Sequence, residues 1–167
     1  YAMDVREKPV TDFLGRQQHI ATEHGGMLNP SDMEEYQRLG GFETLKKVLS
    51  GNDPEGVISE IEKSGLRGRG GGGFPTARKW ATVRKAPGAK KYIILNGDEG
   101  DPGAFMDRMI MESYSYRVIE GMIIASFAVG ATEGVLYIRA EYPLAVKRIR
   151  KALADIQHGC RARLPSR

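Results

Sequence analysis

A glycine-rich stretch, residues 65–73, is the part of this sequence best suited to holding a ligand. Six of its nine residues are glycine, and Arg67 and Arg69 add fixed positive charge. Glycine lacks a side chain and adopts positive φ freely, so the backbone N–H groups of such a loop can approach a ligand closely and turn inward together. These properties suit a flat, anionic, phosphate-bearing ligand, such as a nucleotide or flavin mononucleotide.

Two standard glycine-rich motifs do not describe this stretch. The pattern G-x-G-x-x-G begins at Gly68, but the dinucleotide-binding motif needs a strand before it and a helix after it. Here residues 54–64 predict a helix, with Asp53 as its N-cap and Gly65 ending it. A P-loop is excluded because no Gly-Lys-Ser/Thr follows. A flexible linker or an RGG-like RNA-binding tract remains an alternative, although such tracts repeat and this one occurs once.

A second polar segment, residues 95–105, directly follows a short apolar run. Asn96 offers both donor and acceptor atoms, and Asp98, Glu99 and Asp101 offer acceptors for ring N–H groups or ribose hydroxyls. Three carboxylates this close repel one another and need cations or a ligand. The candidate cations are Arg67, Arg69, Lys79 and Arg108. An exposed acidic turn is the alternative, and a metal site is the weaker one, because no histidine lies nearby and no calcium-loop spacing is matched.

Phe74, which follows the glycines, has two interpretations: a core anchor, or a ring that stacks on a flat ligand at the mouth of the site. The three histidines are scattered and predicted to lie at the surface. The single cysteine, Cys160, excludes an internal disulfide and suits a reducing, cytoplasmic setting.

The elements that must position these segments fall into three regions. Residues 1–64 predict a short helical N-terminal region, with helices near residues 31–39, 42–50 and 54–64. Residues 65–156 predict a partial α/β domain, and residues 157–167 form an atypical Arg-rich tail.

The α/β region predicts the order strand, helix, strand, helix from residue 91 onward. The strands are expected at residues 91–95, buried on both faces, and 135–138. The helices are expected at residues 114–131, long and buried, and 143–156. This order is typical of a right-handed βαβ unit, so the predicted fold class is α/β with a partial Rossmann-like parallel sheet. Ligands bind at the carboxyl ends of such strands, where residues 95–105 would lie.

Length and charge limit the function further. A chain of 167 residues is one average domain, and no stretch has the length and apolarity of a membrane span. The net charge is +4, but the last ten residues hold three arginines and no acid, so the remainder carries only +1. A nucleic-acid-binding surface is therefore not expected.

The segments GLRGRGGGGFPT and NGDEGDPGAFMDR together resemble the FMN/NADH-binding flavoprotein subunit of respiratory complex I. The related diaphorase subunits of NAD(P)-linked hydrogenases and formate dehydrogenases share this pattern, and the resemblance extends over residues 25–155. It implies an oxidoreductase that binds FMN and NAD(H), passes a hydride from NADH to FMN, and sends electrons on to iron–sulfur clusters. The alternative is a non-catalytic nucleotide-binding or subunit-docking fragment.

The resemblance also implies roles for individual residues. Those implied to contact FMN or its phosphate are Gly68, Arg69, Gly70, Gly71 and Lys79. Asn96, Asp98 and Glu99 are implied to address the ribityl chain and isoalloxazine ring. Phe74 and Asp101 are implied to lie near the nicotinamide nucleotide, where Asp101 replaces the commoner glutamate. No side chain is expected to act as acid or base, because the cofactor carries the chemistry.

The sequence departs from the family toward its end. Family members carry a cysteine motif for a [4Fe-4S] cluster, which is absent here, so the chain is expected to be an N-terminal piece without activity alone. The implied partners are a thioredoxin-like [2Fe-2S] subunit and an iron–sulfur, hydrogenase or dehydrogenase subunit of a larger complex. No direct membrane insertion is expected.

Overall fold

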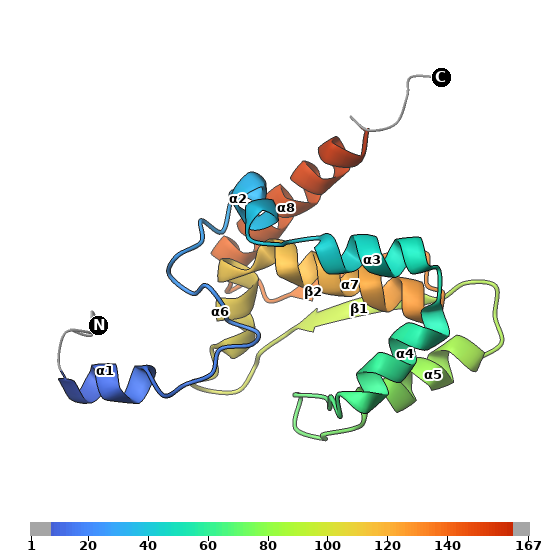
Figure 1. The fold of residues 1–167 in the computed structure, drawn as a ribbon, viewed down its shortest axis with the longest axis horizontal. Coiled ribbons are helices and arrows are strands. Elements are labelled where there is room, and N and C mark those ends of the chain that lie inside the picture. Colours follow the sequence, from blue (N-terminus) through green and yellow to red (C-terminus); the bar gives the residue numbers. More distant parts are fainter. Residues whose placement is uncertain (1–7, 162–167) are drawn as a thin grey trace.

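The computed structural model describes residues 8–161, which form eight helices and two strands (Figure 1). The N-terminal elements are α1 (Lys8–Leu14), α2 (Met33–Arg38), α3 (Glu43–Gly51), α4 (Pro54–Lys63) and α5 (Thr76–Lys85). They are followed by β1 (Tyr92–Gly97), α6 (Met106–Ser113), α7 (Ser115–Val129), β2 (Glu133–Ile138) and α8 (Pro143–Arg161).

The two strands form a parallel pair, as the sequence predicts. The register runs from Tyr92 opposite Glu133 to Gly97 opposite Ile138. Parallel neighbours need a long crossover connection, which α6 and α7 supply. The βαβ arrangement is therefore confirmed, although α6 is an additional helix that the sequence analysis did not predict.

Helix α7 lies at the centre of the described structure. It contacts both strands and five other helices, which are α3, α4, α5, α6 and α8. Its side chains Tyr116, Ile119 and Val129 are buried. A long apolar helix with several neighbours is shielded on most faces, which confirms the predicted buried helix.

The prediction that β1 is buried on both faces is wrong. Leu95, Leu136 and Ile138 pack against the core formed by α6 and α8. The opposite face of the sheet is open, with Ile94 66% and Tyr137 60% exposed. Within residues 8–161, the helices that pack on the sheet lie on one side of it. The apolar run of β1 would suit a strand covered on both faces, but here only one face is covered.

Local capping signals position the N-terminal helices as expected. The Asp32 carboxylate accepts the Glu35 N–H at 2.9 Å, and the Asp53 carboxylate accepts the Gly56 N–H at 2.8 Å. Gly65 follows α4 with φ of 67°, a conformation that glycine adopts without steric cost. The helix before the glycine-rich loop is thereby confirmed.

The last helix is longer than the sequence predicts. Helix α8 does not end at residue 156 but continues through residues 157–161 to Arg161. The rest of the Arg-rich tail, residues 162–167, lies outside the described residues, and the proposed division into three regions stays a prediction.

Candidate functional site

The glycine-rich loop between α4 and α5 is closed at its base by backbone and side-chain contacts. The Gly68 N–H donates to the Phe74 carbonyl at 2.9 Å. The Arg67 guanidinium donates to the Gly73 carbonyl at 3.0 Å, so Arg67 holds the loop itself rather than the acidic turn for which it was a candidate. Gly71 and Gly73 have φ of 93° and 57°, which other residues rarely adopt.

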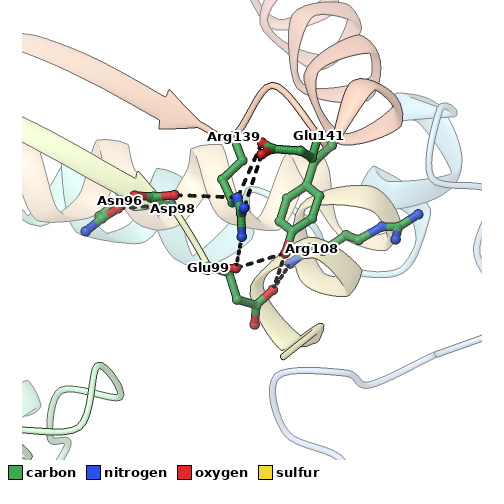
Figure 2. A network of polar contacts seen from close by, with 7 residues as sticks. Asn96, Asp98, Glu99, Arg108, Arg139 and Glu141 are labelled. Atoms are coloured by element: carbon green, nitrogen blue, oxygen red, sulfur yellow. Dashed lines mark hydrogen bonds and ion pairs between the residues drawn. The ribbon is translucent and has the colours of Figure 1, made fainter. Parts of the chain in front are cut away.

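The acidic turn leaves the carboxyl end of β1, on the side of the molecule where the glycine-rich loop lies (Figure 1). The Asp98 N–H donates to the Asn96 side-chain oxygen at 3.0 Å, which tightens the start of the turn. Arg139, directly after β2, donates to the Glu99 backbone carbonyl at 2.6 Å and lies 3.7 Å from the Asp98 carboxylate (Figure 2). Sequence reasoning missed this arginine, because it lies 40 residues from Glu99 along the chain.

The Glu99 side chain is engaged by α6. Its two carboxylate oxygens accept the N–H groups of Asp107 and Arg108 at 2.9 and 3.1 Å, and the Tyr142 hydroxyl lies 3.3 Å away. Burial acts to raise the pKa of Glu99, but these N–H groups and the Tyr142 hydroxyl outweigh it and lower the pKa. A carboxylate at a helix N-terminus is stabilised by the unpaired N–H groups there.

The glycine-rich loop and the acidic turn line one cleft of about 880 Å³. Seven of the ten residues implied to bind cofactor are in its lining: Arg69, Gly70, Gly71, Asn96, Asp98, Glu99 and Asp101. Gly68, Phe74 and Lys79 are outside the lining. The other lining residues lie in or directly after the same acidic segment but were not among those ten, namely Gly100, Gly103, Ala104, Phe105, Met106 and Asp107. Its volume is within the range of small-molecule sites.

Opposite charges line the two sides of the cleft. On the loop side, the Arg69 side chain makes no hydrogen bond or ion pair within residues 8–161. On the turn side lie the carboxylates of Asp98, Glu99, Asp101 and Asp107. Burial, and then the neighbouring Glu99 charge, raise the pKa of Asp107. The cleft therefore offers a free cation for an anionic group and acceptors for hydroxyl or N–H groups.

Phe74 lies at the edge of the loop and is 47% exposed, so it is not a core anchor. The Arg78 guanidinium is 5.8 Å from the centre of its ring. Lys79 is exposed on α5, and its side chain has no polar partner in the described part of the chain. Arg108 pairs with Glu112 at 2.9 Å, so its side chain does not balance the acidic turn.

Two further features bear on the type of site. Among residues 8–161, no three His, Cys, Asp or Glu side chains come together in a way that could hold a metal ion. Within the same range, no helix has both the length and the apolarity that crossing a membrane requires.

Comparison with known proteins assigns the family. The family described as the Nuo51 FMN-binding domain matches residues 61–163, which include both the loop and the acidic turn. The chain belongs to this family. The resemblance of the two glycine-containing segments to the complex I flavoprotein subunit is thereby confirmed.

Two similar proteins are named as subunits of larger enzymes. The chain is 47% identical over 140 residues to the NADP-reducing hydrogenase subunit HndC of Solidesulfovibrio fructosivorans, covering 84% of this chain. It is 44% identical over 120 residues to an NADH-quinone oxidoreductase subunit of Rhizobium meliloti, covering 72% of this chain. In both comparisons the chain spans 28% of the relative's length.

A solved structure supports the fold. A chain in the crystal structure of air-oxidized NAD+-reducing [NiFe]-hydrogenase superposes with a TM-score of 0.61 at 39% identity. The match covers 65% of this chain and 19% of the hydrogenase chain. The α/β fold class with a partial parallel sheet is thus shared with an oxidoreductase subunit.

Proposed function

We propose that this chain forms one part of an FMN site, and that the whole protein is an oxidoreductase subunit that passes a hydride from NADH to FMN. The observation that carries the proposal is the common cleft, in which a glycine-rich loop faces an acceptor-rich turn, and the loop's Arg69 side chain makes no hydrogen bond or ion pair within residues 8–161. The family match over residues 61–163 supports the choice of flavin over other phosphate-bearing ligands.

The residues of the cleft fit FMN in chemical type. Arg69 and the N–H groups of Gly70 and Gly71 would hold the phosphate, because such donors bind anions strongly. The Asn96 amide would accept from or donate to the ribityl hydroxyls and the flavin ring, and the Asp98 carboxylate would accept from them. Lys79 would add positive charge from outside the lining, and Gly68, whose N–H donates to the Phe74 carbonyl, would hold the loop closed. Bound FMN supplies a ring that takes up a hydride, while the protein binds and orients it.

The nicotinamide nucleotide would use the remaining polar and aromatic groups near the loop. Phe74 offers an exposed ring face on which a base can stack, and Asp101 offers an acceptor at the cleft. NAD(H) binding in this place is a proposal, which the names of the hydrogenase and quinone oxidoreductase relatives support.

An iron–sulfur cluster does not fit the residues of this chain. A [4Fe-4S] cluster takes four cysteine thiolates, and the sequence has one cysteine. Onward electron transfer would therefore use other parts of the longer protein or partner subunits. A thioredoxin-like [2Fe-2S] subunit, together with an iron–sulfur, hydrogenase or dehydrogenase subunit, is the proposed partner set in a cytoplasmic complex.

A second candidate is a docking fragment without activity of its own. The open face of the sheet favours it, since Ile94 and Tyr137 are exposed apolar side chains that a further layer would cover. In this interpretation the chain binds nucleotide only after the rest of the protein completes the sheet.

Titration of the purified chain with FMN, followed by quenching of flavin fluorescence, tests the proposal. We expect saturable binding of FMN, and riboflavin weaker by about tenfold because it lacks the phosphate that Arg69 would hold. Arg69→Ala should remove most of this difference, and Arg150→Ala on α8 is the matched control. Absence of FMN binding by the chain would leave the docking fragment as the better description.

A further inference from the structure

We propose that Arg139 and Tyr142 are positioning residues for the cleft. They lie on the segment between β2 and α8, outside the cleft lining, and they hold the acidic turn that follows β1. The end of the second strand would thereby fix the shape of a site built on the first. The contacts stand independently of any ligand, and only the last step, the effect on FMN, rests on the proposed function.

The strand register explains why Arg139 reaches the turn. Gly97, the last residue of β1, pairs with Ile138, the last residue of β2. The next residues, Asp98 and Arg139, therefore leave the sheet side by side. The Arg139 guanidinium then lies 3.7 Å from the Asp98 carboxylate and donates to the Glu99 carbonyl at 2.6 Å.

Gly97 keeps this end of the sheet closely packed. A Cβ placed there would lie 2.8 Å from the Met111 sulfur and 3.1 Å from the Tyr137 carbonyl oxygen, both shorter than ordinary contacts. The close approach places the start of the turn directly against α6 and β2. The chain consequently has little freedom at Gly97, and Arg139 holds the next two residues, Asp98 and Glu99.

Arg139 is itself held in place. Its guanidinium bonds to the Glu141 carboxylate at 3.2 Å and lies over the Tyr142 ring, 5.7 Å from the ring centre. Its side chain is 25% exposed, so these contacts are partly screened from water. Figure 2 shows Arg139 between Asp98, Glu99 and Glu141, where one cation is shared by three partners.

Tyr142 supports Glu99 through its hydroxyl. It is buried, and the hydroxyl lies 3.2 Å from the Glu99 carbonyl and 3.3 Å from the Glu99 carboxylate. The same carboxylate accepts two N–H groups at the start of α6. Glu99 is thus bound at both its backbone and its side chain, and its carboxylate serves the protein framework rather than facing a ligand freely.

The charge of Arg139 matters for an anionic ligand. Asp98, Glu99, Asp101 and Asp107 line the cleft, and carboxylates at this spacing repel one another and any phosphate. Arg139 offsets part of this charge from outside the cleft. The two effects, fixing the turn and offsetting its charge, can be separated, because Arg139→Lys keeps the charge but not the fork-shaped donor geometry.

Amide hydrogen exchange on the complete chain without FMN tests the positioning role directly. We expect Arg139→Gln to speed exchange across residues 98–108 by about tenfold, with a smaller increase for Tyr142→Phe, since each loses hydrogen bonds to Glu99. Exchange in α7 and the melting temperature should stay close to wild type. The matched controls are Arg150→Gln and Tyr137→Phe, whose side chains are exposed on α8 and β2. Unchanged exchange in both test variants overturns the proposal.

FMN titration of the same variants tests the last step. We expect about tenfold weaker FMN binding for Arg139→Gln and partial rescue by Arg139→Lys, because the charge is restored. Faster exchange with unchanged FMN affinity overturns the role toward the cofactor. If the wild-type chain does not bind FMN while the exchange result holds, the FMN proposal fails and the positioning of the turn stands.

Discussion

Glu120 shows how one buried side chain can organise a whole region. It lies on α7, is 8% exposed, and accepts the Tyr36 hydroxyl at 2.6 Å. It also accepts the N–H groups of Phe42 at 2.9 Å and Leu45 at 3.2 Å, at the start of α3. Burial, and then the Glu120 carboxylate, raise the pKa of Tyr36. A buried carboxylate is tolerated because all of these donors satisfy it.

We predict that Tyr36→Phe destabilises the chain by about 1.5–3 kcal/mol, the usual worth of a hydrogen bond to a charged group. Glu120→Ala should cost more, because it leaves three donors without their acceptor. Denaturant unfolding followed by circular dichroism measures both. Tyr137→Phe, at an exposed tyrosine, should change the free energy of unfolding by less than about 0.5 kcal/mol. Equal effects of Tyr36→Phe and Tyr137→Phe would contradict the role of Glu120.

A substitution at Gly70 should affect ligand binding without affecting folding. A Cβ at Gly70 meets nothing within 4 Å, and its φ is outside the left-handed region, so a side chain there is compatible with the loop. Gly70 nevertheless lines the cleft. We predict that Gly70→Val leaves stability within about 0.5 kcal/mol of wild type and weakens FMN binding by about tenfold or more, because backbone can no longer approach the phosphate.

Gly72 provides the control for that prediction. It also has free space around its Cβ, but it is not part of the cleft lining. Thermal unfolding and FMN titration of Gly70→Val and Gly72→Val should therefore agree in stability and differ in affinity. Equal FMN affinity for the two variants would rule out close backbone approach at Gly70.

At the scale of elements, α6 depends on a carboxylate from outside the helix. Its N-cap residue, Phe105, makes no side-chain capping hydrogen bond, and Glu99 accepts two of the first free N–H groups instead. The helix is eight residues long, and short helices gain much from such partners. Glu99 therefore joins the acidic turn to the N-terminal end of α6.

This arrangement predicts a pH dependence. The pKa of Glu99 is lowered below its ordinary value of 4.5 in the folded chain. Its contribution to stability is therefore fully present above that value and is lost as the pH falls through the lower, folded-state pKa. We predict that wild type loses more stability than Glu99→Gln on acidification below pH 4.5, measured by thermal unfolding across a pH series. Parallel pH profiles for the two proteins would contradict this capping role.

At the scale of the whole molecule, the sheet has one covered and one open face. Tyr92, Ile94, Val135 and Tyr137 are between 46% and 66% exposed and belong to the two adjacent strands. Both strands also have a free edge within the described residues, because the sheet contains only this pair. Exposed apolar sheet faces and free edges favour association with other chains.

We predict that the chain alone associates in a concentration-dependent way, and that Ile94→Lys reduces this association. The substitution should leave stability within about 0.5 kcal/mol, because Ile94 is 66% exposed. Light scattering after size-exclusion chromatography measures the effect. Leu49→Lys, at an exposed leucine on α3, is the matched control. A monodisperse wild-type chain at high concentration would show that the open face does not drive association.

The sequence by itself determined the features that depend on near neighbours in the chain. The caps at Asp32 and Asp53, the end of α4 at Gly65, and the glycine-rich loop all act over a few residues, so their local patterns are sufficient. The alternation of strand and helix from residue 91 also predicted the parallel pairing. Seven of the ten residues implied to bind cofactor line one cleft, and their contact with FMN stays a prediction.

Only the tertiary structure decided which distant groups meet. Arg139 bonds to the acidic turn, although the candidate cations lie nearer to it along the chain, because the strand register places Arg139 beside the turn. Glu120 on α7 accepts an N–H group at the start of α3 because the two helices pack together. The exposure of Ile94 has the same origin, since an apolar run does not specify how many of its faces are covered. Local sequence sets the preference of each segment, whereas contacts between segments far apart along the chain exist only once the elements have packed.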